Sequence, residues 1–379
     1  MNISILGATG SVGRQTLEVV SGLPDIKVKA LAAGSDFIKM AEMAKILRPE
    51  LVALYDHKAA LQLQKLLPDI KIAAGIEGLL ECATYPNVDL VVNAVVGSIG
   101  IRPTIAALNS GKDVALANKE TLVAAGPLVM AAAKEHGKKI RTMDSEHSAI
   151  WQCLQGGNIK DVRRLILTAS GGPFRKWTEK EICEATAEDA LRHPNWIMGP
   201  KITIDCATMM NKGLEYIEAH WLFDTPYEKI DVIIHPQSII HSMVEFEDGA
   251  VIAQMADPDM RQPIQYALTY PAHPARPHKP LDFSELKALT FDVPDMQRFP
   301  CLGLAMEAGK IGGTMPAMMN TLNENLVAAY LRREIKFYDI SKIIEKAMVT
   351  YNVRPITNIE DVEEAESWAT QYYIATVCA

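Results

Sequence analysis

The stretch Ile3-Ser4-Ile5-Leu6-Gly7-Ala8-Thr9-Gly10-Ser11-Val12-Gly13 decides how the N-terminal third of the chain folds. A short, mostly apolar run leads into three glycines spaced three apart, and a helical pattern then runs through residues 15–20. Gly7 permits a tight turn, Gly10 lets the backbone approach an anion, and Gly13 lets helix and strand pack closely. The amide groups at the helix start would then face a phosphate. The sequence therefore predicts a nucleotide-binding strand–loop–helix unit. The alternative is a helix start that binds no ligand.

Further strands are expected at residues 28–32, 51–54, 90–94 and 113–117, with helical patterns between them. This alternation predicts an α/β fold that begins with a Rossmann-like open parallel sheet. The second strand leads into Gly34-Ser35-Asp36, where such folds read the ribose 2′ position. Ser35 and Lys39 would meet a 2′-phosphate, whereas Asp36 would oppose one. The residues alone leave the choice between NAD and NADP open.

Asn118-Lys119-Glu120 follows the strand that is expected to end at Ala117. Residues just past the carboxyl ends of strands line the ligand crevice in this architecture. Lys119 would pair there with a nicotinamide-side group or a substrate, and Glu120 would hold it in place. A capped helix start with a solvated Lys–Glu pair is the alternative.

Three carboxylates are candidate ligands for one hard divalent cation: Asp144, Glu146 and Glu215. We expect an extended chain at residues 140–146, on which Asp144 and Glu146 point to the same face. Glu215 lies in a helical pattern and shares a helix face with Asn211 and Lys212. Few carboxylate ligands and open water positions suit Mg²⁺ or Mn²⁺. Exposed acids near a helix cap are the alternative for each residue considered singly.

Two further runs indicate a ligand site. A strand is expected to end at Ser170-Gly171-Gly172, which exposes amides and a hydroxyl to an anion. Residues 193–200, with His193 and Trp196, have the composition of a structured loop that closes over a ligand. Trp196 in the core is the alternative. His235 and His241 are interpreted as structural because they lie six residues apart on an extended apolar run.

The composition indicates a soluble enzyme. The 379 residues suffice for two or three domains, and the net charge of -8 argues against a general nucleic-acid surface. Six cysteines without a C-x-x-C pair are typical of a reduced cytoplasmic protein rather than a disulfide framework or zinc site. No apolar run reaches the length of a membrane span. The first strand begins at Asn2, so no signal peptide is expected.

The C-terminal part contains fewer candidate catalytic or binding residues. Prolines 271, 274, 277 and 280 indicate a linker, and the pattern is helical from Arg298 onward. Residues 320–324 are expected to start a helix, and residues 201–205 are read as a strand. A structural role is predicted for the C-terminal helices.

Taken together, these runs resemble the 1-deoxy-D-xylulose 5-phosphate reductoisomerase family of the non-mevalonate isoprenoid pathway. The resemblance covers nearly the whole chain. It rests on residues 7–13, 117–120, 144–147, 170–174, 193–199, 207–219, 235–242 and 258–261. It implies a V-shaped cytoplasmic homodimer. It also implies an NADPH-binding domain at 1–143, an α+β catalytic domain at 144–270, a linker at 271–295 and a helical domain at 296–379.

The implied reaction is the NADPH-dependent and metal-dependent isomerisation and reduction of 1-deoxy-D-xylulose 5-phosphate to 2-C-methyl-D-erythritol 4-phosphate. The implied catalytic residues are Lys119 and the Mg²⁺ or Mn²⁺ ligands Asp144, Glu146 and Glu215. The implied substrate contacts are Lys119, Ser145, Glu146, Ser170, His193, Trp196, Cys206, Asn211, Lys212 and Glu215. The implied NADPH contacts are Thr9, Gly10, Ser11, Val12, Gly34, Ser35, Asn118, Glu120, Gly199 and Met260.

Two departures from the family pattern stand out. Cys206 occupies a position where the family usually has a phosphate-binding serine. It either contacts the phosphate or packs against the expected strand at 201–205. The loop Gly34-Ser35-Asp36 lacks the basic residue and asparagine found in some members at the 2′-phosphate.

Other classes of protein remain as alternatives. A semialdehyde or homoserine dehydrogenase also has this glycine spacing, but neither explains three carboxylates. A semialdehyde dehydrogenase needs a nucleophilic cysteine, for which only Cys153 is placed near a plausible site. A redox-sensing nucleotide-binding protein would need no metal site.

Overall fold

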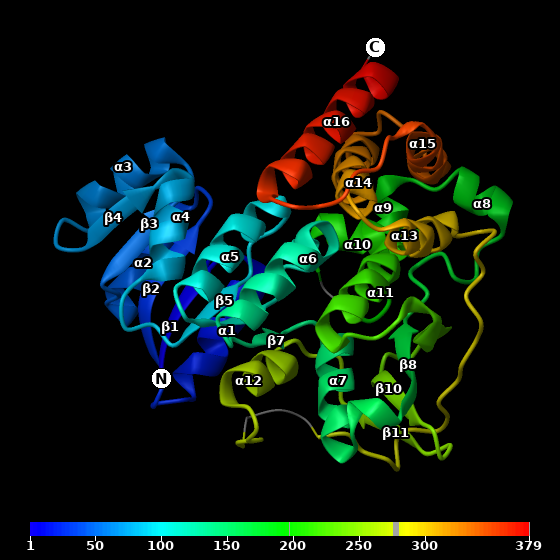
Figure 1. Ribbon diagram of the computed structural model, residues 1–379, viewed down its shortest axis with the longest axis horizontal. Coiled ribbons are helices and arrows are strands. Elements are labelled where there is room, and N and C mark those ends of the chain that lie inside the picture. The colour runs from blue at the N-terminus through cyan, green and yellow to red at the C-terminus, as the bar shows by residue number, and fades with distance from the viewer. Residues whose placement is uncertain (197, 276–279, 379) are drawn as a thin grey trace. The chain divides into compact units, whose positions relative to one another are not determined.

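The structure, a computed structural model, describes residues 1–196, 198–275 and 280–378 (Figure 1). The chain forms two compact units. Unit 1 comprises Met1–Thr121, Pro127–Asp144 and Met260–Pro277, and unit 2 comprises Leu122–Gly126, Ser145–Asp259 and His278–Ala379. Part of the expected linker, residues 276–279 with Pro277, lies outside the described residues.

Unit 1 is built on a seven-stranded parallel sheet with the order β4-β3-β2-β1-β5-β6-β7. Its strands are β1 (Asn2–Leu6), β2 (Lys27–Ala33), β3 (Leu51–Leu54), β4 (Lys71–Ala74), β5 (Leu90–Asn93), β6 (Asp113–Leu116) and β7 (Ile140–Thr142). Its helices are α1 (Ser11–Ser21), α2 (Phe37–Leu47), α3 (His57–Leu66), α4 (Gly75–Thr84), α5 (Ile101–Asn109), α12 (Arg261–Thr269) and most of α6 (Glu120–Glu135).

The strand order of unit 1 reverses between β1 and β5, and this reversal fixes where helices lie. Right-handed crossovers place α1, α2 and α3 on one face of the sheet and α4 and α5 on the other. In agreement, α2 packs against α3, and α4 packs against α5. Ligands of such sheets bind beyond the carboxyl ends of the strands at the reversal. The expected parallel sheet is confirmed.

The glycine loop after β1 shows why small residues are needed there. Gly7 has a φ of +89°, and a Cβ on it would lie 2.4 Å from the carbonyl oxygen of Ala94. A Cβ on Gly13 would lie 2.2 Å from the carbonyl oxygen of Gly7. Gly10 is the N-cap of α1, and no side chain caps this helix. The first amides of α1 are therefore left to a ligand or to water.

Unit 2 contains a mixed four-stranded sheet with the order β11-β10-β8-β9, in which only β8 and β9 are parallel. Its strands are β8 (Val162–Ala169), β9 (Ile230–Ile234), β10 (Ile240–Phe246) and β11 (Val251–Met255). Its helices are α7 (Ser145–Cys153), α8 (Glu179–Cys183), α9 (Ala187–Ala190), α10 (Pro200–Thr208), α11 (Met210–Phe223), α13 (Pro300–Ile311), α14 (Met315–Leu331), α15 (Phe337–Thr350) and α16 (Ile359–Val377).

The C-terminal helices form a packed group within unit 2. Helix α14 contacts α13, α15 and α16, and α13 also packs along α11 (Figure 1). The expected mixed central region and helical C-terminal region are thus confirmed. Within the described residues, no helix has both the length and the apolar character needed to cross a membrane.

Four local expectations were wrong or incomplete. Ser145 begins α7, so Asp144 and Glu146 do not share an extended strand. Residues 201–205 belong to helix α10, because Gly199 and Pro200 form a favourable helix start that overrides the β-branched pattern. Residues 320–324 lie inside α14 rather than at its start. Strand β4 was not expected; it is a four-residue edge strand with one β-branched residue.

The packing of α11 on α13 depends on one glycine. We expect Gly213→Ala to lower the melting temperature, because its Cβ would lie 2.3 Å from the Cβ of Ala305. Overpacking of this kind costs roughly 1–3 kcal/mol. Thermal unfolding followed by circular dichroism measures the change.

Gly303→Ala on α13 is the matched control, since the nearest atom to its Cβ is the Met296 sulfur at 3.8 Å. This helix substitution should be neutral or stabilising, by about 0.5–1 kcal/mol. Equal melting temperatures for the two variants would contradict the packing argument.

Candidate functional site

The first turn of α11 carries the polar residues that the sequence singled out. Met209 has a left-handed backbone, with a φ of +62°, and it joins the end of α10 to the start of α11. This junction places Asn211 and Lys212 one turn before Glu215. The Asn211 side-chain amide donates to Glu215 Oε1 over 2.6 Å. The expected common helix face is confirmed.

Two carboxylates of unit 2 share one ammonium group. Lys212 Nζ lies 3.0 Å from Glu146 Oε1 and also bonds Glu215 Oε2. The Lys212 and Glu215 side chains are only 4% and 1% exposed. Ser145 donates its hydroxyl to Glu146 Oε2 over 2.5 Å. Two carboxylates this close need a positive charge between them, and the Lys212 ammonium supplies it.

Asp144 adds the third carboxylate at the point where β7 leads into α7. Lys119 Nζ lies 2.9 Å from Asp144 Oδ2, with side-chain exposures of 8% and 12%. Oxygens of Asp144, Glu146 and Glu215 all lie within 4.8 Å of one another. Three hard oxygen donors this close match the preference of Mg²⁺ or Mn²⁺.

Ser170 and His193 form a hydrogen-bonded pair in unit 2. His193 Nδ1 accepts from the backbone amides of Asn195 (3.2 Å) and Trp196 (3.0 Å), so the ring proton lies on Nε2. Nε2 then donates to Ser170 Oγ at 3.0 Å, and the Gly172 amide donates to the same oxygen at 3.2 Å. Ser170 Oγ thus accepts twice, which directs its own proton toward an acceptor such as a phosphate.

The loop after His193 is anchored to the strand connection at 236–238. The Asn195 amide donates to the Pro236 carbonyl oxygen (2.7 Å) and to Ser238 Oγ (2.8 Å). Trp196 is half-buried, and its ring centroid lies 6.1 Å from that of His241. His241 Nε2 contacts the Ala256 carbonyl oxygen at 3.2 Å, and His235 Nδ1 contacts that of Thr290 at 3.0 Å. Both histidines are buried, as their structural interpretation requires.

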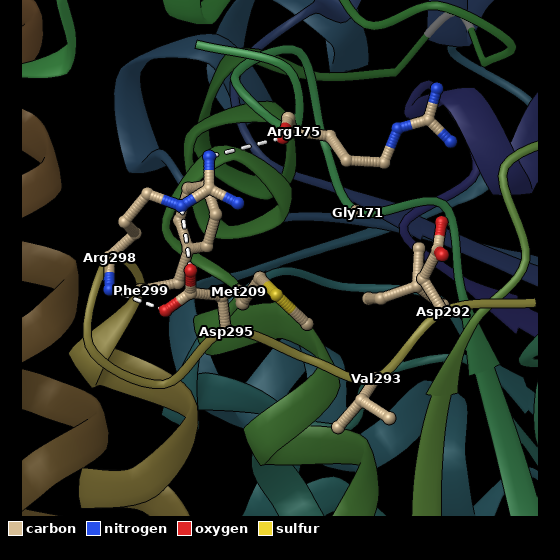
Figure 2. A pocket seen from close by; sticks show the side chains of 9 residues that line it. Gly171, Arg175, Met209, Asp292, Val293, Asp295, Arg298 and Phe299 are labelled. Carbon is tan, nitrogen blue, oxygen red and sulfur yellow. Dashed lines mark hydrogen bonds and ion pairs between the residues drawn. The ribbon is translucent and has the colours of Figure 1, made fainter. Parts of the chain in front are cut away.

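Arg298 fixes the segment that follows Ser170. Its Nη1 donates to the carbonyl oxygens of Arg175 (3.2 Å) and Trp177 (2.7 Å), and its Nε donates to Asp295 (2.8 Å). Figure 2 shows Arg298 reaching Arg175 and Asp295 at the wall of a cavity of about 300 Å³. Gly171 and Met209 also line this cavity. The sequence offered no signal for this long-range anchor.

The cysteines bear on two open questions. Cys206 is half-buried on α10, and a Cβ on Gly172 would lie 2.5 Å from its carbonyl oxygen. The residue therefore lies beside the glycine loop, on a helix rather than against a strand.

Burial raises the pKa of Cys153 to about 11. A thiol so reluctant to ionise is a poor nucleophile, which removes the support for a semialdehyde dehydrogenase.

The predicted nucleotide residues of unit 1 gather beyond β1 and β2. Thr9 and Val12 are half-buried, whereas Gly10, Ser11, Gly34 and Ser35 are exposed. Lys39, predicted with Ser35 to meet a 2′-phosphate, forms an ion pair with Asp36 at 2.7 Å. The hydrogen bonds from Lys39 lower the pKa of Asp36, and the charge of Arg14 adds to this effect. Arg14, one helical turn after Gly10, is a nearby cation that sequence reasoning missed.

The other four predicted nucleotide contacts lie in different surroundings. Asn118 donates its amide to the carbonyl oxygens of Val95 (3.1 Å) and Gly97 (3.0 Å) and to Glu120 (2.9 Å). These bonds fasten the loop after β5. Met260 packs against the core of unit 1. Gly199 belongs to unit 2, as the N-cap of α10.

Comparison with known proteins gives consistent matches. The family model described as 1-deoxy-D-xylulose 5-phosphate reductoisomerase matches residues 3–126, and two models of its C-terminal domains match residues 140–223 and 255–372. Reductoisomerases of Heliobacterium modesticaldum and Bacillus cereus (strain Q1) are 52% and 51% identical over 375 residues. The alignments cover 98% of this chain and 96% and 98% of the relatives.

Solved structures agree. The reductoisomerase of Zymomonas mobilis in complex with NADPH is 43% identical, with a TM-score of 0.93 over 99% of this chain and 98% of that one. A DOX-P reductoisomerase in complex with NADPH, fosmidomycin and magnesium is 39% identical, with a TM-score of 0.92 over 98% of both chains.

The environment of His193 predicts its protonation. Desolvation lowers the pKa of His193 to about 4, so the ring should stay neutral, with its proton on Nε2, from about pH 8 down to about pH 5. Two-dimensional imidazole ¹H–¹⁵N spectra, assigned with His193→Gln, would show this tautomer. A folded-state midpoint near 6.5 would contradict the prediction.

The same shift has a consequence for stability. As the pH falls, a histidine of the unfolded chain binds a proton near pH 6.5. His193 of the folded chain binds one only near its lower pKa of about 4. The stabilisation from neutral His193 is therefore present above about pH 6.5 and is lost as the pH falls toward 4. His193→Gln should remove this part of the pH dependence.

Proposed function

The chain belongs to the 1-deoxy-D-xylulose 5-phosphate reductoisomerase family, and we infer that it converts 1-deoxy-D-xylulose 5-phosphate to 2-C-methyl-D-erythritol 4-phosphate. It is an NADPH-dependent oxidoreductase that uses Mg²⁺ or Mn²⁺. The observation that carries this inference within the molecule is the cluster of Asp144, Glu146 and Glu215, because three converging carboxylates serve no purpose in simple hydride transfer.

The donor set fits a divalent cation. We propose Asp144, Glu146 and Glu215 as its ligands. The position of Lys212 Nζ between Glu146 and Glu215 supports this, since a positive charge already stands there. When bound, the metal supplies Lewis-acid stabilisation of the oxygen charge that develops while the carbon skeleton breaks and rejoins.

The substrate phosphate is assigned to unit 2. Ser170 would offer a hydroxyl proton, Asn211 an amide and Lys212 an ammonium group, and His193 and Cys206 are proposed as further contacts. Neutral His193 positions Ser170 rather than neutralising charge, so Lys212 is the cationic member of this group. Phosphate binding far from the reacting carbons would provide energy for loop closure by residues around Trp196.

NADPH is assigned to the carboxyl edge of the sheet in unit 1. The uncapped start of α1 at Thr9, Gly10, Ser11 and Val12 would bind the pyrophosphate. Gly34 and Ser35 would lie at the 2′-phosphate. Asn118, Glu120, Gly199 and Met260 remain proposed contacts of the nucleotide, with Met260 near the nicotinamide.

The chain's own groups then have separate roles in the reaction. Lys119 and Ser145 would hold the substrate hydroxyls, and Lys119 also pairs with Asp144. Isomerisation converts the ketose phosphate to a branched aldehyde without a redox change. The aldehyde carbon then takes hydride from NADPH and its oxygen takes a proton, which yields the alcohol and NADP⁺.

We also propose the assembly and organisation that the family resemblance implies. The enzyme would be a cytoplasmic homodimer that acts on a small sugar phosphate and binds neither nucleic acid nor membrane. The division into domains at 1–143, 144–270 and 296–379, with a linker at 271–295, is proposed on the same basis.

A direct assay tests the activity. We expect NADPH oxidation, followed at 340 nm, to require both 1-deoxy-D-xylulose 5-phosphate and Mg²⁺ or Mn²⁺, and to stop on chelation. NADPH should be preferred to NADH. The ratio of the two specificity constants should be smaller than is usual in the family, because the Asp36 carboxylate lies close to the expected 2′-phosphate position. Oxidation that persists without substrate or metal would defeat the assignment.

Glu215→Gln tests the metal cluster. We expect turnover to fall by about 10²-fold or more, because an amide replaces an ionised ligand. The dissociation constant of NADPH, measured by fluorescence, should stay unchanged, since the nucleotide residues lie mostly in unit 1. Near-normal turnover in limiting Mg²⁺ would refute the assignment. Glu247→Gln, at an exposed position of the same unit, is the matched control.

A further inference from the structure

One buried histidine bridges the two helices that carry Glu146 and Glu215. His147 follows Glu146 on α7, and its Nε2 lies 2.9 Å from the Glu215 carbonyl oxygen on α11. Its Nδ1 lies 3.2 Å from Glu218 Oε2, one turn further along α11. The side chains of His147 and Glu218 are 0% and 1% exposed. Both ring nitrogens of one α7 residue therefore face acceptors on α11.

The contact is almost fully enclosed. Nε2 faces a carbonyl oxygen, so it carries a proton and donates. Nδ1 lies close to Glu218 Oε2 but outside hydrogen-bond angles. Polar groups with so little exposure depend on the few neighbours they have, so removing either member of this contact is costly.

The position of the pair relative to the carboxylates gives it a role. His147 is the next residue after Glu146, and Glu218 lies three residues after Glu215 on the same helix. A change in the His147–Glu218 contact would therefore change the separation of the Glu146 and Glu215 backbones. Lys212 bonds both carboxylates, but an ammonium on a flexible stem is a weaker constraint on their separation than a contact between the two helices.

We propose that Glu218 and His147 are positioning residues that set the spacing of Glu146 and Glu215 for the divalent cation. Neither is proposed to touch substrate or NADPH. The inference rests on the proposed function, in that Glu146 and Glu215 bind the metal. Partners that orient metal ligands matter for affinity because they hold the donor atoms at the required separation before the ion arrives.

Binding of Mn²⁺ alone, measured by electron paramagnetic resonance and by calorimetry without substrate, tests the proposal. Glu218→Ala should weaken Mn²⁺ affinity by roughly 10-fold, the lower end of the loss seen for such partners. Glu218→Gln should restore most of the affinity, because its amide keeps the shape of the contact and can donate to Nδ1. Affinity in Glu218→Ala equal to that of the unaltered enzyme would overturn the proposal.

Tyr216→Phe is the matched control on the same helix. It removes a buried hydrogen bond from the Tyr216 hydroxyl to the Tyr227 carbonyl oxygen (2.9 Å). It should lower the melting temperature without changing Mn²⁺ affinity. If it weakened Mn²⁺ binding as much as Glu218→Ala does, the pair would be merely structural and the proposal would fail.

A second variant keeps the test decisive if Glu218→Ala does not fold. His147→Gln alone should weaken Mn²⁺ binding by a similar factor, because it alters the same contact from the α7 side. Mn²⁺ affinity in His147→Gln equal to that of the unaltered enzyme would contradict the shared role. Glu215→Gln separates the assignment of the metal ligands from the positioning role of His147 and Glu218. If it leaves Mn²⁺ binding intact, the metal assignment fails; if it abolishes binding while the His147 and Glu218 variants bind normally, only the positioning role fails.

Discussion

Two close carboxylates on neighbouring helices, Glu215 buried and Glu146 half-buried, impose the constraint on which the rest of unit 2 depends. Glu146 and Glu215 repel one another at this separation, and burial strengthens the repulsion. The chain meets this cost with Lys212 and with rigid helix placement. The left-handed residue Met209 turns the chain into α11, and Gly213 lets α11 approach α13 closely. The C-terminal helices are therefore part of what holds the carboxylates together, even though they supply none of them.

The N-terminal sheet was predictable because its signals are local. Apolar strands, a glycine loop and helical patterns follow one another within short windows, so β1, β2, β3, β5 and β6 were placed within one residue and α1 within four residues at its start, whereas β4 was missed. The meeting of the candidate site residues on α11 was predictable for a similar reason. Asn211, Lys212 and Glu215 lie on one helix, where spacing alone determines which side chains meet.

Long-range features were not predictable from the sequence. Asp144 and Glu146 do converge, but the reason is a strand that ends where α7 begins, not the alternation of an extended chain. The β-branched residues at 202–204 favoured a strand. The structure has a helix there instead, because Gly199 and Pro200 form its start. Arg298 lies more than a hundred residues from the loop that it anchors. The ion pair between Lys39 and Asp36 was also not predicted, because composition does not show which local partner a lysine takes.

The bonding of Lys212 has a thermodynamic consequence. Its ammonium is held by Glu146 and Glu215, yet it is also the cation assigned to the phosphate. A divalent ion that took both carboxylates would release this ammonium, and a phosphate would then gain it without first breaking an ion pair. The affinities for the two ligands would therefore be linked, and thermodynamic linkage is reciprocal. Each ligand would strengthen the binding of the other through a single side chain, without any change in the fold.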